Sequence, residues 1–217
     1  MKKIINLFLS IILIFSCLSI IGCQKNNPLE ANVVELRSNV YNAESEAYRL
    51  KASYGFKMDE KNNKIYALTV FLYDRLTDNA TYSLSLIYGG TNYQQIFTLN
   101  PLKNVLSLEF QIENFNQNKF EATLISSSFA EKIVFNSTVP SNTLDYKKAL
   151  EHFQADQKTL IENRIENDEF TSKIVMRIIV KNDKAYWYIG IIEKDGSLKA
   201  LLLDGQSGKT LAIREVF

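Results

Sequence analysis

The chain has 217 residues, of which 46% are hydrophobic and 12% aromatic, so it is long enough to bury one or two hydrophobic cores. Its 25 Lys and Arg residues nearly balance its 24 Asp and Glu residues. Because binding to phosphate-rich partners depends on clustered basic side chains, this balance gives no support to a nucleic-acid-binding protein.

The N-terminus has the pattern of an export signal. Met1, Lys2 and Lys3 form a short basic start, and the almost wholly apolar segment Ile4 to Ile21 follows. Next, Ile20-Ile21-Gly22-Cys23 resembles the lipobox of bacterial lipoproteins. This resemblance implies a signal peptide over residues 1–22 that is removed, and a diacylglyceryl group on the Cys23 sulfur with a further acyl chain, such as palmitate, on its amine. The alternative is an uncleaved signal anchor, because roughly 20 apolar residues also span a bilayer.

Residues 23–30 are predicted to form a polar tether that carries Pro28. Since two or more acyl chains hold a protein stably on a membrane, we expect an exported protein anchored in a cell membrane and facing its extracytoplasmic side. In a cell with two membranes, Gln24 favours the outer one, because no retention aspartate follows the lipid site. With Cys17 in the signal and Cys23 acylated, no cysteine is left for a disulfide or a thiolate site.

Residues 31–140 show a period-2 alternation of apolar and polar residues, which predicts short antiparallel strands. Gly89-Gly90-Thr91-Asn92 supplies a turn between two of them. Seven or eight short strands are typical of an antiparallel sandwich or barrel, and of these we favour an immunoglobulin-like β-sandwich, although no Cys-Trp-Cys landmark is present. The predicted strands are 49–54, 66–73, 81–86, 93–99, 105–112, 120–125 and 132–135.

Residues 141–217 are predicted to form a small α+β domain, so the whole chain is expected to be mainly β. Asn142 is a suitable N-cap for an amphipathic helix from Thr143 to Arg164, in which apolar residues recur at helical spacing. Four strands then follow as an antiparallel meander on which the helix packs. These strands are predicted at 174–180, 185–193, 198–203 and 210–215.

Asp204 and Gly208 form an Asp-x-x-x-Gly turn before the last predicted strand, after the runs Ala185 to Ile192 and Leu201 to Leu203. Together these strands and this turn resemble a PepSY-type domain, a family found in the propeptides of secreted peptidases and in many envelope proteins, in which such a turn commonly precedes the last strand. The resemblance implies one helix on a few antiparallel strands. It also implies an alternative function, as an inhibitor or chaperone-like regulator of a secreted peptidase. Turn chemistry alone also accounts for Gly208.

No catalytic residue, metal or cofactor is predicted. The segment Gly205 to Thr210 ends like a phosphate-binding loop, but Leu203 stands where that motif needs glycine and a strand follows where it needs a helix. His152 is the only histidine, so a zinc site or a histidine-activated nucleophile would have one member at best. A hydrolase that uses scattered carboxylates is the remaining enzymatic alternative.

Tyr186, Trp187, Tyr188 and Asp204 are the candidate binding residues. Trp187 faces one side of its strand and the two tyrosines face the other, and core packing is the favoured role for Trp187. Because the helix can cover only one face of this apolar sheet, the other face is expected to meet the N-terminal domain, a second copy or a partner. We therefore predict a non-catalytic, membrane-anchored binding module whose partner is another envelope protein.

Overall fold

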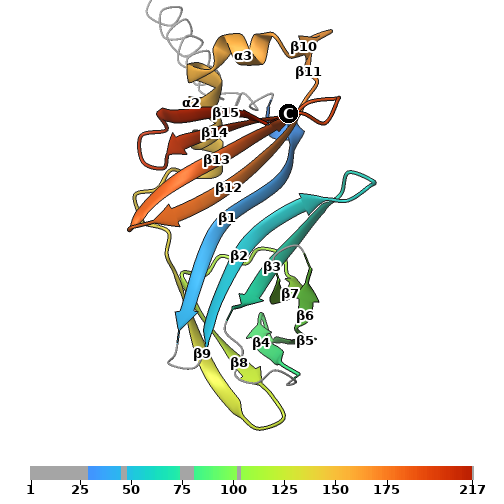
Figure 1. Cartoon of the computed structure of the whole chain (residues 1–217), viewed down its shortest axis with the longest axis vertical. Coiled ribbons are helices and arrows are strands. Elements are labelled where there is room, and N and C mark those ends of the chain that lie inside the picture. Colours follow the sequence, from blue (N-terminus) through green and yellow to red (C-terminus); the bar gives the residue numbers. More distant parts are fainter. Residues whose placement is uncertain (1–28, 45–47, 74–80, 102–103, 217) are drawn as a thin grey trace, which may run out of the picture.

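The fold is mainly β, as predicted, and it is described here from a computed structural model that covers residues 29–44, 48–73, 81–101 and 104–216 (Figure 1). The predicted signal peptide, lipobox and Cys23 lie outside these described residues. The strands are β1 (Val33–Glu44), β2 (Arg49–Met58), β3 (Lys64–Leu72), β4 (Ser83–Tyr88), β5 (Thr91–Ile96), β6 (Thr98–Asn100), β7 (Val105–Gln111), β8 (Lys119–Ile125), β9 (Ala130–Ser137), β10 (Ile165–Glu166), β11 (Glu169–Phe170), β12 (Lys173–Lys181), β13 (Lys184–Ile192), β14 (Leu198–Asp204) and β15 (Thr210–Val216).

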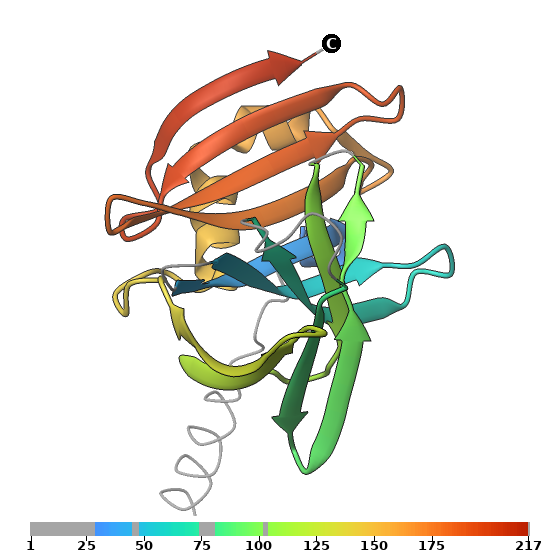
Figure 2. The ribbon, with the colours of Figure 1, turned by 60° about the horizontal axis from the view of Figure 1, so that its bottom comes forward.

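Within the described residues, one sheet of 13 strands runs through the molecule in the order β15-β14-β13-β12-β1-β2-β3-β7-β6. The remaining strands of this sheet branch off as β9, β8, β4 and β5, starting from the second half of β1. Every strand predicted from the sequence is present, and the predicted strand 93–99 is divided into β5 and β6. In Figure 2 the C-terminal strands lie at the top and the N-terminal strands curl beneath them.

The N-terminal strands form a near-closed, barrel-like sheet and do not separate clearly into the two layers of an immunoglobulin sandwich. The reason lies in β1, which pairs with β2 along most of its length and with β9 through Tyr41 and Asn42. The strands that continue the sheet on its two sides, β2 and β9, therefore both pair with β1. Where β5 approaches β7, the rings of Tyr93 and Phe110 meet edge to face with centroids 6.2 Å apart.

Aromatic side chains fill the interior of the barrel-like sheet. Phe115 contacts the rings of Tyr41, Tyr54 and Phe120, and its backbone N–H donates to the Tyr54 hydroxyl at 3.0 Å. The fully buried Tyr41 donates its hydroxyl hydrogen to the Gln117 carbonyl at 2.8 Å. Burial raises the pKa of Tyr41 well above its usual range, so it stays a neutral donor.

The C-terminal part consists of helices packed on one face of the strands β12 to β15. Its helices are α2 (Tyr146–Asp156) and α3 (Lys158–Glu162). Ala149, Leu150 and Phe153 of α2 are buried against this sheet. β1 joins the sheet as a parallel neighbour of β12, a pairing that the sequence analysis did not predict. The residues buried between the helices and this sheet form a second hydrophobic core, distinct from the first core inside the barrel-like sheet. The second core also includes residues of the N-terminal strands and of the short turn before them, namely Leu29, Val33, Leu36 and Phe56.

Two details of the predicted helix were wrong. The N-cap is Asp145, whose carboxylate accepts from the Lys148 backbone N–H at 2.9 Å, and the helix starts after it rather than after Asn142. The helix also does not run unbroken to Arg164, because Gln157 leaves helical geometry between α2 and α3. The side chain of Gln157 donates to the Thr210 hydroxyl at 3.3 Å, so contact with β15 accompanies the break.

A fragment of residues 141–217 tests the predicted division into two domains. We expect this fragment to bind a hydrophobic dye and to be less stable than the mature chain, because it lacks Leu29, Val33, Leu36 and Phe56, which are buried in the second core. The measurement is dye fluorescence and urea unfolding of the fragment beside residues 24–217. A cooperative fragment that binds no dye would contradict this expectation and support independent domains.

Candidate functional site: the open face of the sheet and its groove

One face of the continuous sheet carries most residues of both cores, and the opposite face is here called the open face. The alternation is clear on β2, where Leu50, Ala52, Tyr54 and Phe56 all belong to the cores. The residues between them point the other way, toward the open face. Because β15 to β6 form one sheet, the open face extends from the C-terminal strands across β1 to β3 and β7.

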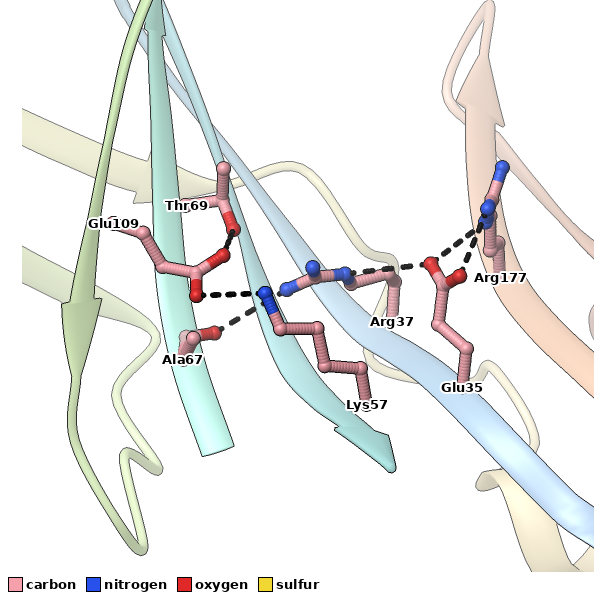
Figure 3. Close-up of polar contacts among 7 residues, drawn as sticks. All are labelled: Glu35, Arg37, Lys57, Ala67, Thr69, Glu109 and Arg177. Carbon is pink, nitrogen blue, oxygen red and sulfur yellow. Dashed lines mark hydrogen bonds and ion pairs between the residues drawn. The ribbon is translucent and has the colours of Figure 1, made fainter. Parts of the chain in front are cut away.

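A row of charged side chains crosses the open face from β12 to β7 (Figure 3). Glu35 on β1 accepts two hydrogen bonds from Arg177 on β12, at 3.0 Å from Nε and 2.9 Å from Nη2. These hydrogen bonds raise the pKa of Arg177. Farther along, Lys57 on β2 donates to Glu109 on β7 at 3.1 Å.

Arg37 lies between these two ion pairs. Its Nε is 3.7 Å from the Glu35 carboxylate, and its Nη1 donates to the Ala67 carbonyl at 3.5 Å. Only 16% of its side chain is exposed. In Figure 3 the guanidinium reaches away from β1 toward Lys57 and Ala67. The polar contacts of Arg37 are thus longer than those of Arg177 and Lys57 in the same row.

A groove of about 650 Å³ opens where the C-terminal strands meet β1, β2 and β3 on the open face. Its charged lining consists of Glu35, Arg37 and Arg177. The apolar lining comes from both halves of the chain. The remaining lining residues are Val40, Ser53, Thr69, Phe71, Ile178, Ile179 and Tyr188.

The structure separates the three neighbouring aromatic candidates. Trp187 is 1% exposed, lies in the second core and donates its Nε1 hydrogen to the Leu144 carbonyl at 3.0 Å, so it presents no surface to a ligand. Tyr186 and Tyr188 are half-buried on the open face. Tyr188 lies low on the sheet, because a Cβ placed on Gly190 would be only 3.1 Å from its hydroxyl oxygen.

Asp204 lies away from the groove, in the turn before β15. Its Oδ1 accepts from the backbone N–H groups of Gln206 and Ser207 at 3.1 and 2.8 Å. Gly208 closes this turn at φ 71°, and a Cβ there would fall within 3.0 Å of three side-chain atoms of His152. The predicted Asp-x-x-x-Gly turn therefore packs closely against His152 of α2.

We expect Asp204 to make stability depend on pH. Hydrogen bonds, chiefly from the Ser207 backbone N–H, hold the pKa of Asp204 below its ordinary value of 3.8. A carboxyl with a lowered pKa in the folded state contributes stability above its unfolded pKa, and this contribution is lost as pH falls through the folded pKa. Between neutral pH and about pH 3, the native chain should lose up to about 1 kcal/mol more than Asp204→Asn, a small effect because the group is solvated. Urea unfolding at several pH values measures the difference, and parallel pH profiles would contradict it.

Among the described residues, no group of three or more His, Cys, Asp and Glu side chains is placed to hold a metal ion. In the same part of the chain, no helix is long and apolar enough to cross a membrane. Comparisons of the sequence and the structure with protein-family models, curated proteins and solved structures found no match. The PepSY resemblance therefore stays a prediction.

Most residues of the groove were not predicted from the sequence. Tyr188 was the one lining residue among the candidates, while the charged residues Glu35, Arg37 and Arg177 were not singled out. The available signal was the presence of charged residues within strands, at positions facing away from the core. That signal gains meaning only once β1 is known to pair with β12, which places Arg37 beside Arg177.

Proposed function

We propose that this chain is a lipid-anchored, non-catalytic binding module of the bacterial cell envelope, and that its open face docks on another envelope protein. The observation that carries the proposal is the apolar surface of β13 and β14 on that face. Its large apolar side chains are half-buried and belong to neither core. They are Tyr186, Tyr188, Ile192, Leu198 and Leu202.

A contiguous apolar surface of this kind is typical of interaction sites, because exposed apolar area is otherwise kept small in soluble proteins. Docking of a partner would bury these side chains and gain about 25 cal/mol for each Å² of apolar surface removed from water. The helices already cover the opposite side of the same strands. α2 thus covers one face of these strands, and the partner is proposed to cover the open face.

The localisation part of the proposal is tested with Cys23→Ser. We expect lipid labelling to be lost and the mature chain to leave the membrane fraction, because the acyl chains on Cys23 are the proposed anchor. The measurement is labelled-fatty-acid incorporation and membrane fractionation in a bacterial host. As a control, Ser19→Ala alters the signal segment without touching the lipobox and should change neither readout. Retained labelling in Cys23→Ser would contradict the anchor.

A second candidate is a regulator of a secreted peptidase. It is supported by the helices α2 and α3 beside the four antiparallel strands β12 to β15, and by the Asp204 to Gly208 turn before the last of them. A gene for a secreted peptidase beside this one would favour it. Inhibition of that peptidase by residues 24–217 would be the direct measurement, and unchanged peptidase activity would contradict it.

A further inference from the structure

We propose that the groove on the open face binds a small organic acid, in which one carboxylate is attached to an aromatic or aliphatic body. The carboxylate would bind Arg37, and the body would lie against the apolar lining. This inference rests on the proposed non-catalytic binding role and names the chemistry of one ligand.

The charged lining of the groove has an excess of one positive charge. It contains two guanidinium groups, Arg37 and Arg177, and one carboxylate, Glu35. Both oxygens of Glu35 accept from Arg177 at 3.0 and 2.9 Å, in the paired geometry that makes such ion pairs strong. One further anionic group would neutralise the lining, whereas a polyanion would meet the negative charges of Glu35 and of Glu109 nearby.

Of the two guanidinium groups in the lining, Arg37 has the longer polar contacts, because Arg177 is already paired with Glu35. Among the described residues its closest carboxylate is Glu35 at 3.7 Å, which is too long for a hydrogen bond, and its bond to the Ala67 carbonyl is long at 3.5 Å. A guanidinium has five N–H donors, so Arg37 keeps donors for a carboxylate that binds two of them at about 2.8 Å. Because 84% of the side chain is already covered, little rotamer freedom remains to be lost on binding.

The walls of the groove match an apolar body rather than a bare ion. Val40 and Phe71 line it from the N-terminal strands β1 and β3, and Ile179 and Tyr188 line it from the C-terminal strands β12 and β13. Ile179 is 42% exposed, which is high for a large apolar residue within a strand. The volume of about 650 Å³ falls among known small-molecule sites, which run from roughly 300 to 1,000 Å³ and are mostly apolar with a few polar groups.

The experiment is an NMR titration of ¹⁵N-labelled residues 24–217 with 3-phenylpropionate. We expect saturable shifts at the amides of Arg37, Phe71 and Ile179, with a Kd of about 1 mM or tighter. Two probes separate the parts of the ligand. The neutral 3-phenylpropionamide lacks the charge, and acetate and inorganic phosphate lack the body, and each should bind at least about tenfold more weakly.

Variants assign the binding to Arg37. Arg37→Gln should weaken 3-phenylpropionate binding about tenfold, since it replaces the charged fork with a neutral amide. Arg214→Gln is the matched control. Arg214 lies on the edge strand β15, where it pairs with Ala200 of β14, so the variant removes the same charge from the same face of the sheet. It should leave the Kd unchanged. Urea unfolding of both variants confirms that each is folded.

Three results would overturn the proposal: no saturable shifts at the groove, equal binding of the amide, or equal binding of phosphate, which would indicate a generic anion site. Equal weakening by Arg37→Gln and Arg214→Gln would also overturn the assignment to Arg37. None of these results bears on the docking of an envelope protein. That part is measured separately by crosslinking in the membrane, so the two proposals can fail independently.

Discussion

Gly55→Ala is expected to unfold the chain or to destabilise it by about 4 kcal/mol or more. A Cβ on Gly55 would lie closer than 3.0 Å to three backbone atoms of β1, the carbonyl carbon and oxygen of Leu36 and the Cα of Arg37. The reason for this close approach is the register shift between Arg37 and Asn39, where β1 carries an extra residue opposite β2. Backbone atoms of a central strand cannot move away as the end of a side chain can, so the cost falls on the strand that joins both cores.

The control for this prediction is Gly196→Ala. Gly196 has φ 85°, but apart from its two chain neighbours no atom of the described residues lies within 4 Å of the position of its Cβ. It should therefore cost about 1 kcal/mol from backbone strain alone. Urea unfolding of both variants measures the contrast. If Gly55→Ala lowers the free energy of unfolding no more than Gly196→Ala does, the close approach of the β1 backbone to Gly55 is contradicted.

Trp187→Ala is expected to cost about 3 to 5 kcal/mol, the range for removing a large aromatic side chain from a core. Trp187 is 1% exposed and lies between the α2 helix and the sheet in the second core. Its hydrogen bond to the Leu144 carbonyl also fixes the chain just before α2. Losing both the ring and the donor should loosen the attachment of the helix.

Trp187→Phe separates these two contributions. It keeps most of the apolar ring and removes the donor, so we expect a smaller loss of about 1 to 3 kcal/mol. Tyr186→Ala, on the open face of the same strand, should cost less than Trp187→Ala because Tyr186 belongs to neither core. Thermal and urea unfolding measure all three. Equal losses for Trp187→Ala and Tyr186→Ala would contradict the assignment of the two faces.

Local patterns predicted the local structure well. The alternation in residues 66–73 corresponds to β3, and Gly89 and Gly90 form the turn between β4 and β5. These elements depend on side-chain period and turn chemistry, which are written in neighbouring residues. The helix break at Gln157 has no such signal, since neither Gly nor Pro stands there. It coincides with the contact to Thr210, which lies far along the chain.

The candidate site depends on a strand pairing that no local sequence pattern indicates. The parallel pairing of β1 with β12 joins Leu36 to Met176, residues with no local relationship. Parallel strands need a long connection, so their pairing leaves no turn signal in the sequence. Once this pairing exists, Arg37 and Arg177 share one face and the groove follows. Tyr188 was predictable because its alternation with the buried Trp187 is visible in the strand itself.

The central claim, that the open face docks on another envelope protein, is tested most directly by site-specific photo-crosslinking in the native membrane. A photoreactive phenylalanine analogue replaces Tyr186 or Leu202 on the open face of the acylated protein. Glu151 is the control position, since it is exposed on α2 at the opposite side of the sheet. We predict one defined adduct with the same envelope protein from Tyr186 and Leu202, and none from Glu151. No adduct from either open-face position, or the same adduct from all three, would contradict the claim.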